Sequence, residues 1–249
     1  MTTYDLADFG HDAMTECGAR LRLLGNGAAS MEEVARRIVG HFYEGFRDGA
    51  GGERQLVLAR LFRTLPYHDL DQRLKAEARE GMRGERPGRG TRCLTLLATS
   101  GERPEWNDRR LSARHAVIPF MSAAFLAQFP MLSQLIQQCG FDLGALLEPD
   151  RELLLDLEQR SYNVFHVSEA KGSPWLPAQE SFVMPHAVKS VIGFGGLLPS
   201  GDLFAAILFS RAPISRETAN RFAPLALSAK VALLPFVGRA VFMAEGGRG

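Results

Sequence analysis

The segment VKSVIGFGGLLPSGDLFAAILFS, residues 188–210, decides the fold of this chain. Two apolar runs, Val188 to Leu198 and Asp202 to Ser210, are separated by Pro199-Ser-Gly-Asp202. Proline and glycine in so short a connection are typical of a turn, because they supply the backbone angles that a chain reversal requires. The segment therefore predicts a β-hairpin.

Three further strands are predicted upstream of the hairpin. Residues 55–62 follow a glycine-rich turn and mix leucine, valine and phenylalanine, and residues 92–99 have a similar composition. The run Tyr162-Asn-Val-Phe-His-Val167 has the alternation of a strand. Together with the hairpin, these segments predict an antiparallel sheet of about five strands.

Helical spacing of apolar residues marks most of the remaining chain. Ser30 and Glu33 have the capping-box spacing of a helix start, and Ser215 is expected to be the N-cap of the last helix. Pro130 is expected to kink or split the helical segment that contains it, since proline removes an intrahelical hydrogen bond. The predicted helical segments are 6–24, 30–46, 69–80, 116–160 and 215–237.

Helices at both ends of the chain would bracket the sheet, which is an α+β layout with a helical layer on the sheet. We expect residues 1–29 to form an N-terminal helix and residues 30–237 to form one domain with a helical insertion at 116–160. Residues 238–249 are expected to be a flexible tail.

The composition fits a folded cytoplasmic protein. The 29 basic and 28 acidic side chains nearly cancel, which leaves no general attraction for nucleic acid or an anionic membrane. No stretch approaches the ~18 uncharged apolar residues that are needed to cross a bilayer. The three cysteines, Cys17, Cys93 and Cys139, are in no paired motif, which fits a reducing compartment. We therefore expect a cytoplasmic protein that binds neither nucleic acid nor membrane.

Four segments, 56–67, 162–170, 173–183 and 189–210, together resemble the GAF/PAS-like sensory domains of bacterial signalling proteins. In such domains a glycine-rich hairpin forms the central strands and the final helix packs on the sheet. They are found ahead of histidine-kinase or nucleotide-cyclase modules. Because the family binds cyclic nucleotides, haem, tetrapyrroles or small metabolites, and some members bind nothing, the resemblance implies a sensory role without naming a ligand.

We expect a small molecule to bind between the sheet and the helical insertion. Ligand pockets are lined mainly by apolar and aromatic groups with a few polar ones, and aromatic residues are dense around the predicted strands. Some of these aromatic residues are also expected to fill the core. The candidate ligand-binding residues are Phe165, His166, Trp175, Phe182, His186, Phe194, Phe204 and Arg92, with Lys189 and Arg211 as further polar contacts.

The two histidines of this set allow a second hypothesis. His166 alternates with Phe165 and Val167 and so points to the opposite face of its strand from both. Together with a carboxylate such as Glu169, His166 and His186 could bind a metal ion, and one histidine could ligate haem iron. The simpler interpretation is that a strand histidine is a hydrogen-bonded core or rim residue. Metal or haem binding is therefore an alternative to a metal-free pocket.

The sequence contains no recognisable catalytic motif, and we expect no enzyme. Signatures of phosphate-binding loops, hydrolase nucleophiles, zinc proteases and paired-cysteine sites are missing. Gly193, Gly195 and Gly196 lead into a turn and not into a helix N-terminus that could face a phosphate. They are interpreted as strand glycines that admit a ligand or a large neighbour close to the backbone.

The terminal helices predict a homodimer, which the resemblance also implies. The apolar stripe from Leu6 to Leu24 has seam-like spacing, while the helix at 30–46 is available to cover the sheet. In the leading hypothesis, ligand occupancy changes the packing of the end helices, and a kinase or cyclase is the expected signalling partner. The remaining alternative is a ligand-free dimerisation module with a fully packed core.

Overall fold

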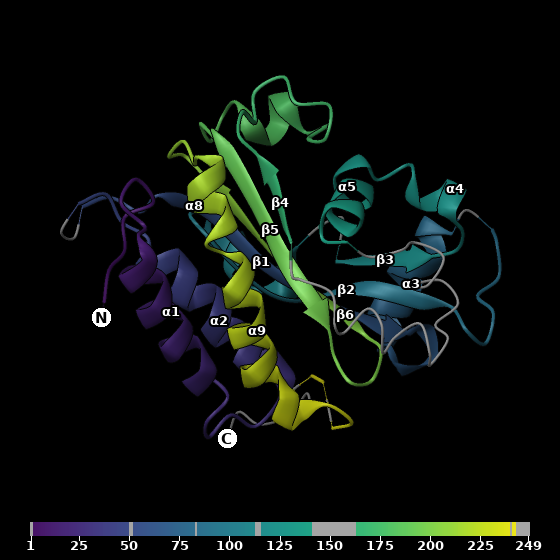
Figure 1. The fold of residues 1–249 in the computed structure, drawn as a ribbon. Helices are drawn as coiled ribbons and strands as arrows, with labels where there is room; N and C mark the ends of the chain where they lie inside the picture. The colour runs from purple at the N-terminus through teal and green to yellow at the C-terminus, as the bar shows by residue number, and fades with distance from the viewer. Residues whose placement is uncertain are drawn as a thin grey trace.

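The computed structural model describes residues 2–49, 52–82, 84–112, 116–140, 163–239 and 241–242. Its centre is a six-stranded antiparallel sheet with strand order β3-β2-β1-β6-β5-β4 (Figure 1). The strands are β1 (Leu56–Pro66), β2 (Arg92–Gly101), β3 (Val117–Phe120), β4 (Val164–Val167), β5 (Ser190–Leu197) and β6 (Leu203–Ser210).

The predicted hairpin is confirmed as β5 and β6. Their register places Gly193 opposite Ile207, and the turn closes with a hydrogen bond from the Leu198 N–H to the Asp202 carbonyl oxygen at 2.9 Å. Gly201 has a φ of +76°, the left-handed conformation that glycine adopts without strain. Because β6 also pairs with β1, the hairpin supplies one of the two central strands of the sheet.

The prediction of helix from residue 116 is wrong at its start. Residues 117–120 form β3, which pairs with β2 and lies at an edge of the sheet, where the missing N–H of Pro119 is tolerated. A short apolar run cannot be assigned to helix or strand by its periodicity alone. The sheet therefore has six strands where the sequence predicted about five.

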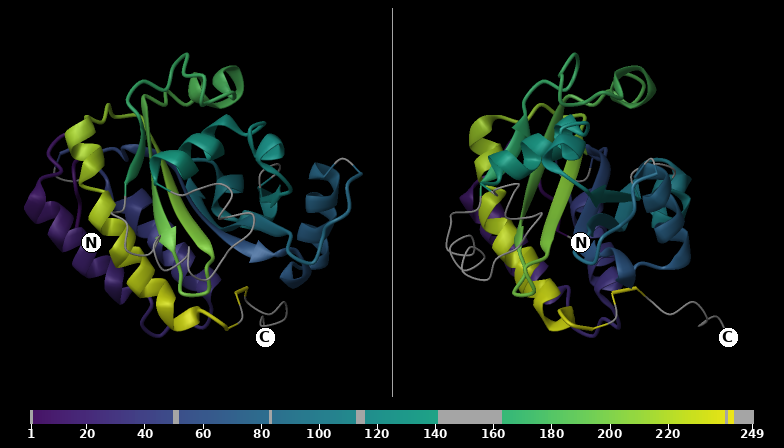
Figure 2. Two further views of the ribbon diagram at one scale, coloured as in Figure 1. Left: turned by 45° about the vertical axis from the view of Figure 1, so that its right-hand side comes forward. Right: turned by 90° about the vertical axis from the view of Figure 1, so that its right-hand side faces the viewer.

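One face of the sheet is covered by α1 (His11–Leu23), α2 (Met31–Gly45), α8 (Arg216–Asn220) and α9 (Ala223–Leu233). Helices α1 and α9 pack side by side along this face in both views of Figure 2. Beneath them the rings of Phe42 and Phe222 contact Phe194 of β5, with centroid separations of 5.5 and 5.8 Å, and Phe46 packs against both of these rings. This helical layer therefore has an aromatic core shared with the sheet.

The predicted helix starts are confirmed. The Ser30 hydroxyl accepts the backbone N–H of Glu33, and the Ser215 hydroxyl accepts that of Thr218. The last helix is shorter than predicted, because Pro224 begins α9 separately from α8 and Pro235 lies in a closing 3-10 turn. The first helix begins at His11, so Leu6 and Phe9 of the predicted stripe lie before it, where the chain bends and turns, and both are buried.

The other face of the sheet is covered by α4 (Ala123–Leu126), α5 (Pro130–Gln138) and the connection from β4 to β5, which includes a π-helical turn at Gln179–Val183. Pro130 begins α5, so the predicted split of the insertion is confirmed. The part of the predicted insertion from 141 to 160 lies outside the described residues. At the sheet edge, α3 (Gln72–Gly81) packs against β3.

Two of the predicted end segments share the main core. The buried face of α1, with Cys17 and Leu21, packs in the same cluster as the sheet and α9. Of the expected tail, Val241 accepts a hydrogen bond from the Glu32 N–H, and the ring of Phe242 lies under the Arg109 guanidinium at 4.0 Å. Within the described helices, no segment is long and apolar enough to cross a membrane.

The glycines of β5 allow two close approaches. A Cβ at Gly193 would lie 2.7 Å from Cδ1 of Leu135 on α5, and a Cβ at Gly195 would overlap the carbonyl oxygen of Phe204 on β6. The first contact is with a side chain, which can move, and the second is with the backbone of the neighbouring strand. Gly193 thus admits a large neighbour, one of the two roles that the sequence suggested.

We predict that Gly195→Ala lowers the free energy of unfolding by about 1–3 kcal/mol, the usual cost of overpacking in a core. Gly40→Ala on α2 is the matched control, because nothing lies within 4 Å of a Cβ there. It should be neutral or stabilise the protein by up to about 1 kcal/mol, since alanine favours a helix over glycine. Urea denaturation of both variants measures the difference, and equal stabilities would contradict the packing described.

Candidate functional site

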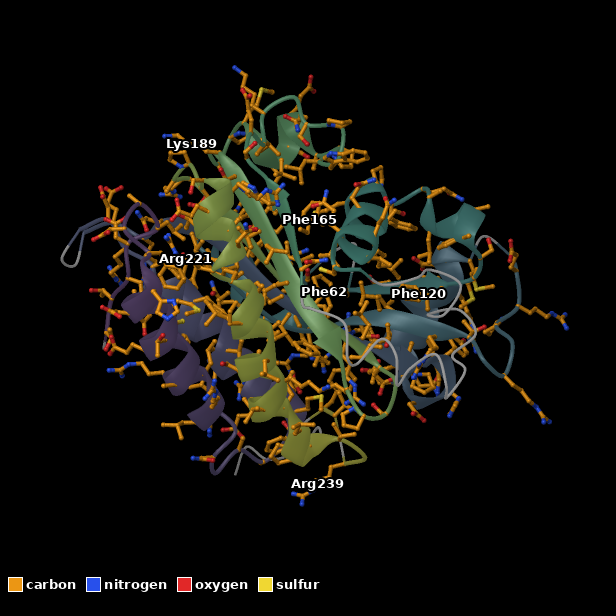
Figure 3. All side chains as sticks on the ribbon, viewed as in Figure 1. Phe62, Phe120, Phe165, Lys189, Arg221 and Arg239 are labelled. Atoms are coloured by element: carbon orange, nitrogen blue, oxygen red, sulfur yellow. The ribbon has the colours of Figure 1, made fainter. Side chains whose placement is uncertain are left out.

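A cavity of about 380 Å³ lies between the sheet and the α4–α5 layer. Alternate residues of β1, Leu58, Arg60 and Phe62, form its floor, since successive strand residues point to opposite faces. Phe129 and Leu132 from the α4–α5 segment lie across from them. Phe62, labelled in Figure 3, belongs to the same core cluster as Leu132 and Leu135 of α5, and not to the cluster under α1 and α9.

An aromatic wall closes one side of the cavity. Phe182, in the π-helical turn, meets Phe209 of β6 edge-on at 5.1 Å and Trp106 at 5.5 Å between ring centroids. All three rings line the cavity. Single π-helical turns are frequently found at functional sites, and here the turn directs Phe182 toward the sheet.

Polar residues behind this wall hold it in place. His186 packs on Trp106 with ring centroids 4.7 Å apart, and its Nδ1 pairs with the carboxylate of Glu102. The second oxygen of Glu102 pairs with the Arg211 guanidinium, just after β6. One carboxylate at the end of β2 therefore connects the 179–186 segment to the strand that carries Phe209.

Arg60 is the one charged side chain among the described lining residues of the cavity. Its Nη2 donates to the Ser112 hydroxyl at 3.1 Å, and its buried Nε has no hydrogen-bond partner. Burial lowers the pKa of Arg60 to about 10, which still leaves the guanidinium charged at neutral pH. The remaining described wall is apolar apart from Gln128 and the edge of Trp106.

The structure brings some of the sequence-predicted residues to this cavity. Phe182 lines it directly, and His186 and Arg211 support its aromatic wall. Phe165 faces the same side of the sheet but is fully buried in the core next to Leu135 and Gly193, and Trp175 packs on that core at the surface.

Other predicted residues lie elsewhere. Phe194 and Phe204 point to the opposite face and belong to the aromatic core under α1, α2 and α9. Arg92 forms an ion pair with Asp202 at the turn of the β5–β6 hairpin. Lys189 is exposed at the start of β5, where Figure 3 labels it.

His166 and His186 do not share a site. His166 is on the helix-covered face, where its Nε2 lies 3.0 Å from the carbonyl oxygen of Ile214, whereas His186 is on the cavity side. His166 is therefore the hydrogen-bonded core residue of the simpler interpretation. Over the described ranges, no group of three or more His, Cys, Asp or Glu side chains is placed to hold a metal ion.

The one close cysteine–histidine contact is not activated for nucleophilic chemistry. Cys17 Sγ lies 3.5 Å from Nε2 of His41 in the core between α1 and α2. Burial raises the pKa of the Cys17 thiol to about 12 and lowers the pKa of His41 to about 4. Both groups are therefore neutral at physiological pH, and a thiolate, the reactive form, is disfavoured.

Sequence reasoning missed Arg60. The signal was present, because Leu56-Val-Leu-Ala-Arg-Leu-Phe62 carries one cation in an otherwise apolar strand. From the sequence alone, however, a lone arginine in such a run can equally be a residue at the sheet edge whose long side chain reaches water. Its significance depends on β1 lying at the centre of the sheet, which only the strand order shows.

The buried histidines predict an acid-dependent loss of stability. Burial lowers the pKa of His41 to about 4 and, with Arg216 nearby, also lowers the pKa of His166. An unfolded histidine titrates near pH ~6.5, so between that pH and about 4 the unfolded chain binds more protons than the folded one. The free energy of unfolding should therefore fall as the pH is lowered through this range.

His41→Gln should reduce this slope by up to about 1.4 kcal/mol per pH unit, the maximum for one proton. Denaturant unfolding at several pH values between 6.5 and 4.5 measures it. His11→Gln, at an exposed position on α1, is the control and should keep the wild-type slope. An unchanged slope in His41→Gln would show that folding does not lower the pKa of this ring.

Comparison with known proteins identifies similar folds but no sequence family. No family model matches the sequence, and no curated protein matches it by sequence. A free methionine-R-sulfoxide reductase from Neisseria meningitidis, solved with its substrate, is 11% identical at a TM-score of 0.46, with 90% of each chain covered. The GAF domain of a phosphoenolpyruvate-protein phosphotransferase from Coxiella burnetii is 12% identical at a TM-score of 0.44, with 90% of this chain and 96% of that chain covered.

The expected fold class is confirmed. The chain is α+β, with a six-stranded antiparallel sheet flanked by N- and C-terminal helices. The glycine-bearing hairpin contributes to the centre of the sheet, and α9 packs on it, as the resemblance implied. No residue role is carried over from either solved structure.

Proposed function

We propose that this chain is a regulatory domain that binds a small organic molecule in the cavity between the sheet and the α4–α5 layer. The observation that carries the proposal is the cavity itself. Its volume of about 380 Å³ and its largely apolar wall are characteristic of small-molecule sites, which span ~300–1,000 Å³. Protein interiors are otherwise packed with few voids larger than a water molecule.

The position of the cavity supports a regulatory role. Ile207 and Phe209 of β6 face the cavity, while Ala206 and Leu208, which alternate with them, belong to the core under the terminal helices. A ligand that moves β6 would therefore change what α9 packs against. Such a ligand shifts the arrangement of the helices only by its difference in affinity for the two states.

The proposed role is binding without a chemical step. Among the described residues, Cys17 and His41 form the only cysteine–histidine hydrogen-bond contact, and this pair lies away from the cavity. Both groups are neutral at physiological pH, which supports binding without a chemical step. The proposed signalling partner is a kinase or cyclase that responds to the arrangement of the end helices.

Ala178→Trp tests the proposed site. Ala178 lines the cavity from the exposed connection before the π-helical turn, so an indole there should occupy the cavity without disturbing a strand. The uncharged dye N-phenyl-1-naphthylamine, which fluoresces in apolar surroundings, should bind the wild type and bind Ala178→Trp at least tenfold more weakly. Ala76→Trp, at an exposed position on α3, should bind as the wild type does.

Dye binding that is absent from the wild type, or equal in wild type and Ala178→Trp, would contradict the proposed site. Native mass spectrometry of protein purified under mild conditions provides a second measurement. It should detect a non-covalently bound small molecule in the wild type and a lower occupancy in Ala178→Trp.

We also propose that the chain forms a homodimer, now through α9 alone. The stripe expected on the first helix is unavailable to a partner, because Leu6, Cys17 and Leu21 are buried within the chain. On α9 and the turn after it, Leu227, Val231 and Leu234 remain 46%, 39% and 37% exposed at a spacing of four and three residues. Apolar residues at such spacing form one stripe, which an identical helix can cover.

The double variant Leu227→Glu/Val231→Glu should be a monomer, because facing carboxylates would repel and could not be desolvated at such an interface. Sedimentation velocity at micromolar concentration measures the mass. Leu111→Glu, another exposed leucine outside the terminal helices, should leave the dimer intact. A wild-type protein that sediments as a monomer would refute the proposal.

A further inference from the structure

Arg60 is the charged residue of the cavity floor. It lies midway along β1, opposite Ile207 of β6 and Thr99 of β2 in the strand register. Leu58 and Phe62, its neighbours on the same face, are apolar. The backbone that carries this charge is therefore in a central strand and not at an edge of the sheet.

The two buried arginines of the described chain are paired with carboxylates. Arg63, three residues further along β1, donates to Asp202 at 2.6 Å, and Arg109 donates to Glu32 at 2.7 Å. Arg60 has no carboxylate within ion-pair distance among the residues that the structure describes. Among the described residues, its side chain donates to the uncharged hydroxyl of Ser112.

A second unpartnered polar group lies beside it. The hydroxyl of Thr99, directly across from Arg60 and 4% exposed, has no hydrogen-bond partner, and neither does the Arg60 Nε. Buried polar groups without partners lose their hydrogen bonds to water and gain none in return. Of these two residues Arg60 lines the cavity, and unlike Arg63 and Arg109 it has no carboxylate partner among the described residues. The cavity beside Arg60 is therefore a place where a ligand atom is expected.

Resting on the proposed function, we propose that the cavity binds an organic monoanion, with its acid group at Arg60 and its apolar body along the aromatic wall. The planar guanidinium is suited to carboxylate, phosphate or sulfonate oxygens, which it can contact through more than one N–H. Ser112, whose oxygen already accepts from Arg60, keeps its own proton to donate to the same acid group.

The described lining limits the ligand class further. One cation is available, so one negative charge is matched and a second would be left unpaired in an apolar wall. Phe182, Trp106 and Phe209 offer flat apolar contacts for the rest of the molecule. Aromatic and medium-chain organic acids have this combination of one acid group and an apolar body.

A matched pair of dyes tests the inference. The probe 8-anilinonaphthalene-1-sulfonate carries one sulfonate, and N-phenyl-1-naphthylamine is the same molecule without it. The wild type should bind the sulfonate at least tenfold more tightly than the uncharged dye, as measured by fluorescence titration. Arg60→Met should lose that preference and keep its affinity for the uncharged dye, because methionine retains an unbranched apolar stem.

Two further variants control the charge effect. Arg60→Lys should keep part of the preference, because the charge remains while the planar fork is lost. Arg20→Met, on the exposed side of α1, changes the net charge equally and should keep the full wild-type preference.

Equal affinity of the wild type for both dyes, or a preference that survives in Arg60→Met, would overturn the inference and leave the proposed site intact. Failure of both dyes to bind the wild type would instead overturn the proposed function, and the inference with it.

Thermal unfolding gives an independent readout. If Arg60 is held unpaired for a ligand, Arg60→Met should raise the melting temperature of the ligand-free protein, because an uncompensated buried charge is removed. In the wild type, saturating sulfonate dye should raise the melting temperature, and in Arg60→Met the same concentration should raise it less. A lower melting temperature in ligand-free Arg60→Met would show that Arg60 is structural.

Discussion

The pairing of β1 with β6 is the constraint on which the rest of the structure depends. These two strands lie far apart in sequence and form the centre of the sheet, with register partners from Leu56 opposite Ser210 to Arg63 opposite Phe204. Every other strand is added outward from this pair. Because alternate residues of a strand point to opposite faces, the same two strands also divide the apolar residues between two separate layers.

The two layers are filled differently. Under α1, α2 and α9, the rings of Phe42, Phe46, Phe194 and Phe222 pack in the core that these helices share with the sheet. On the other face, α5 packs against β4, and Gly193 of β5 makes room for its Leu135. Over β1 and β6 a cavity separates the sheet from the α4–α5 layer. A ligand in the cavity would contact strands whose opposite face packs against the terminal helices.

Electrostatics distinguishes the cavity from the rest of the interior. Arg63 and Arg109 form ion pairs with Asp202 and Glu32 of the same chain, and these pairs offset the cost of burying the charges. Arg60 lacks such a partner among the described residues and is adjacent to the unpartnered hydroxyl of Thr99. Proteins tolerate destabilising groups of this kind at functional sites, where a ligand supplies the missing interaction.

The sequence by itself determined the local structure, namely the β5–β6 hairpin, the helix starts at Ser30 and Ser215 and the break at Pro130. It could do so because turn residues, helix caps and proline act on their immediate neighbours in the chain. It also determined the α+β class, and it failed at 117–120, where a short apolar run has no distinctive period. Only the tertiary structure decided which residues share a face. Phe182 and Arg60 meet at one cavity while Phe194 and His166 lie behind the sheet. That division depends on strand order and register, which are set by contacts between segments distant in the chain.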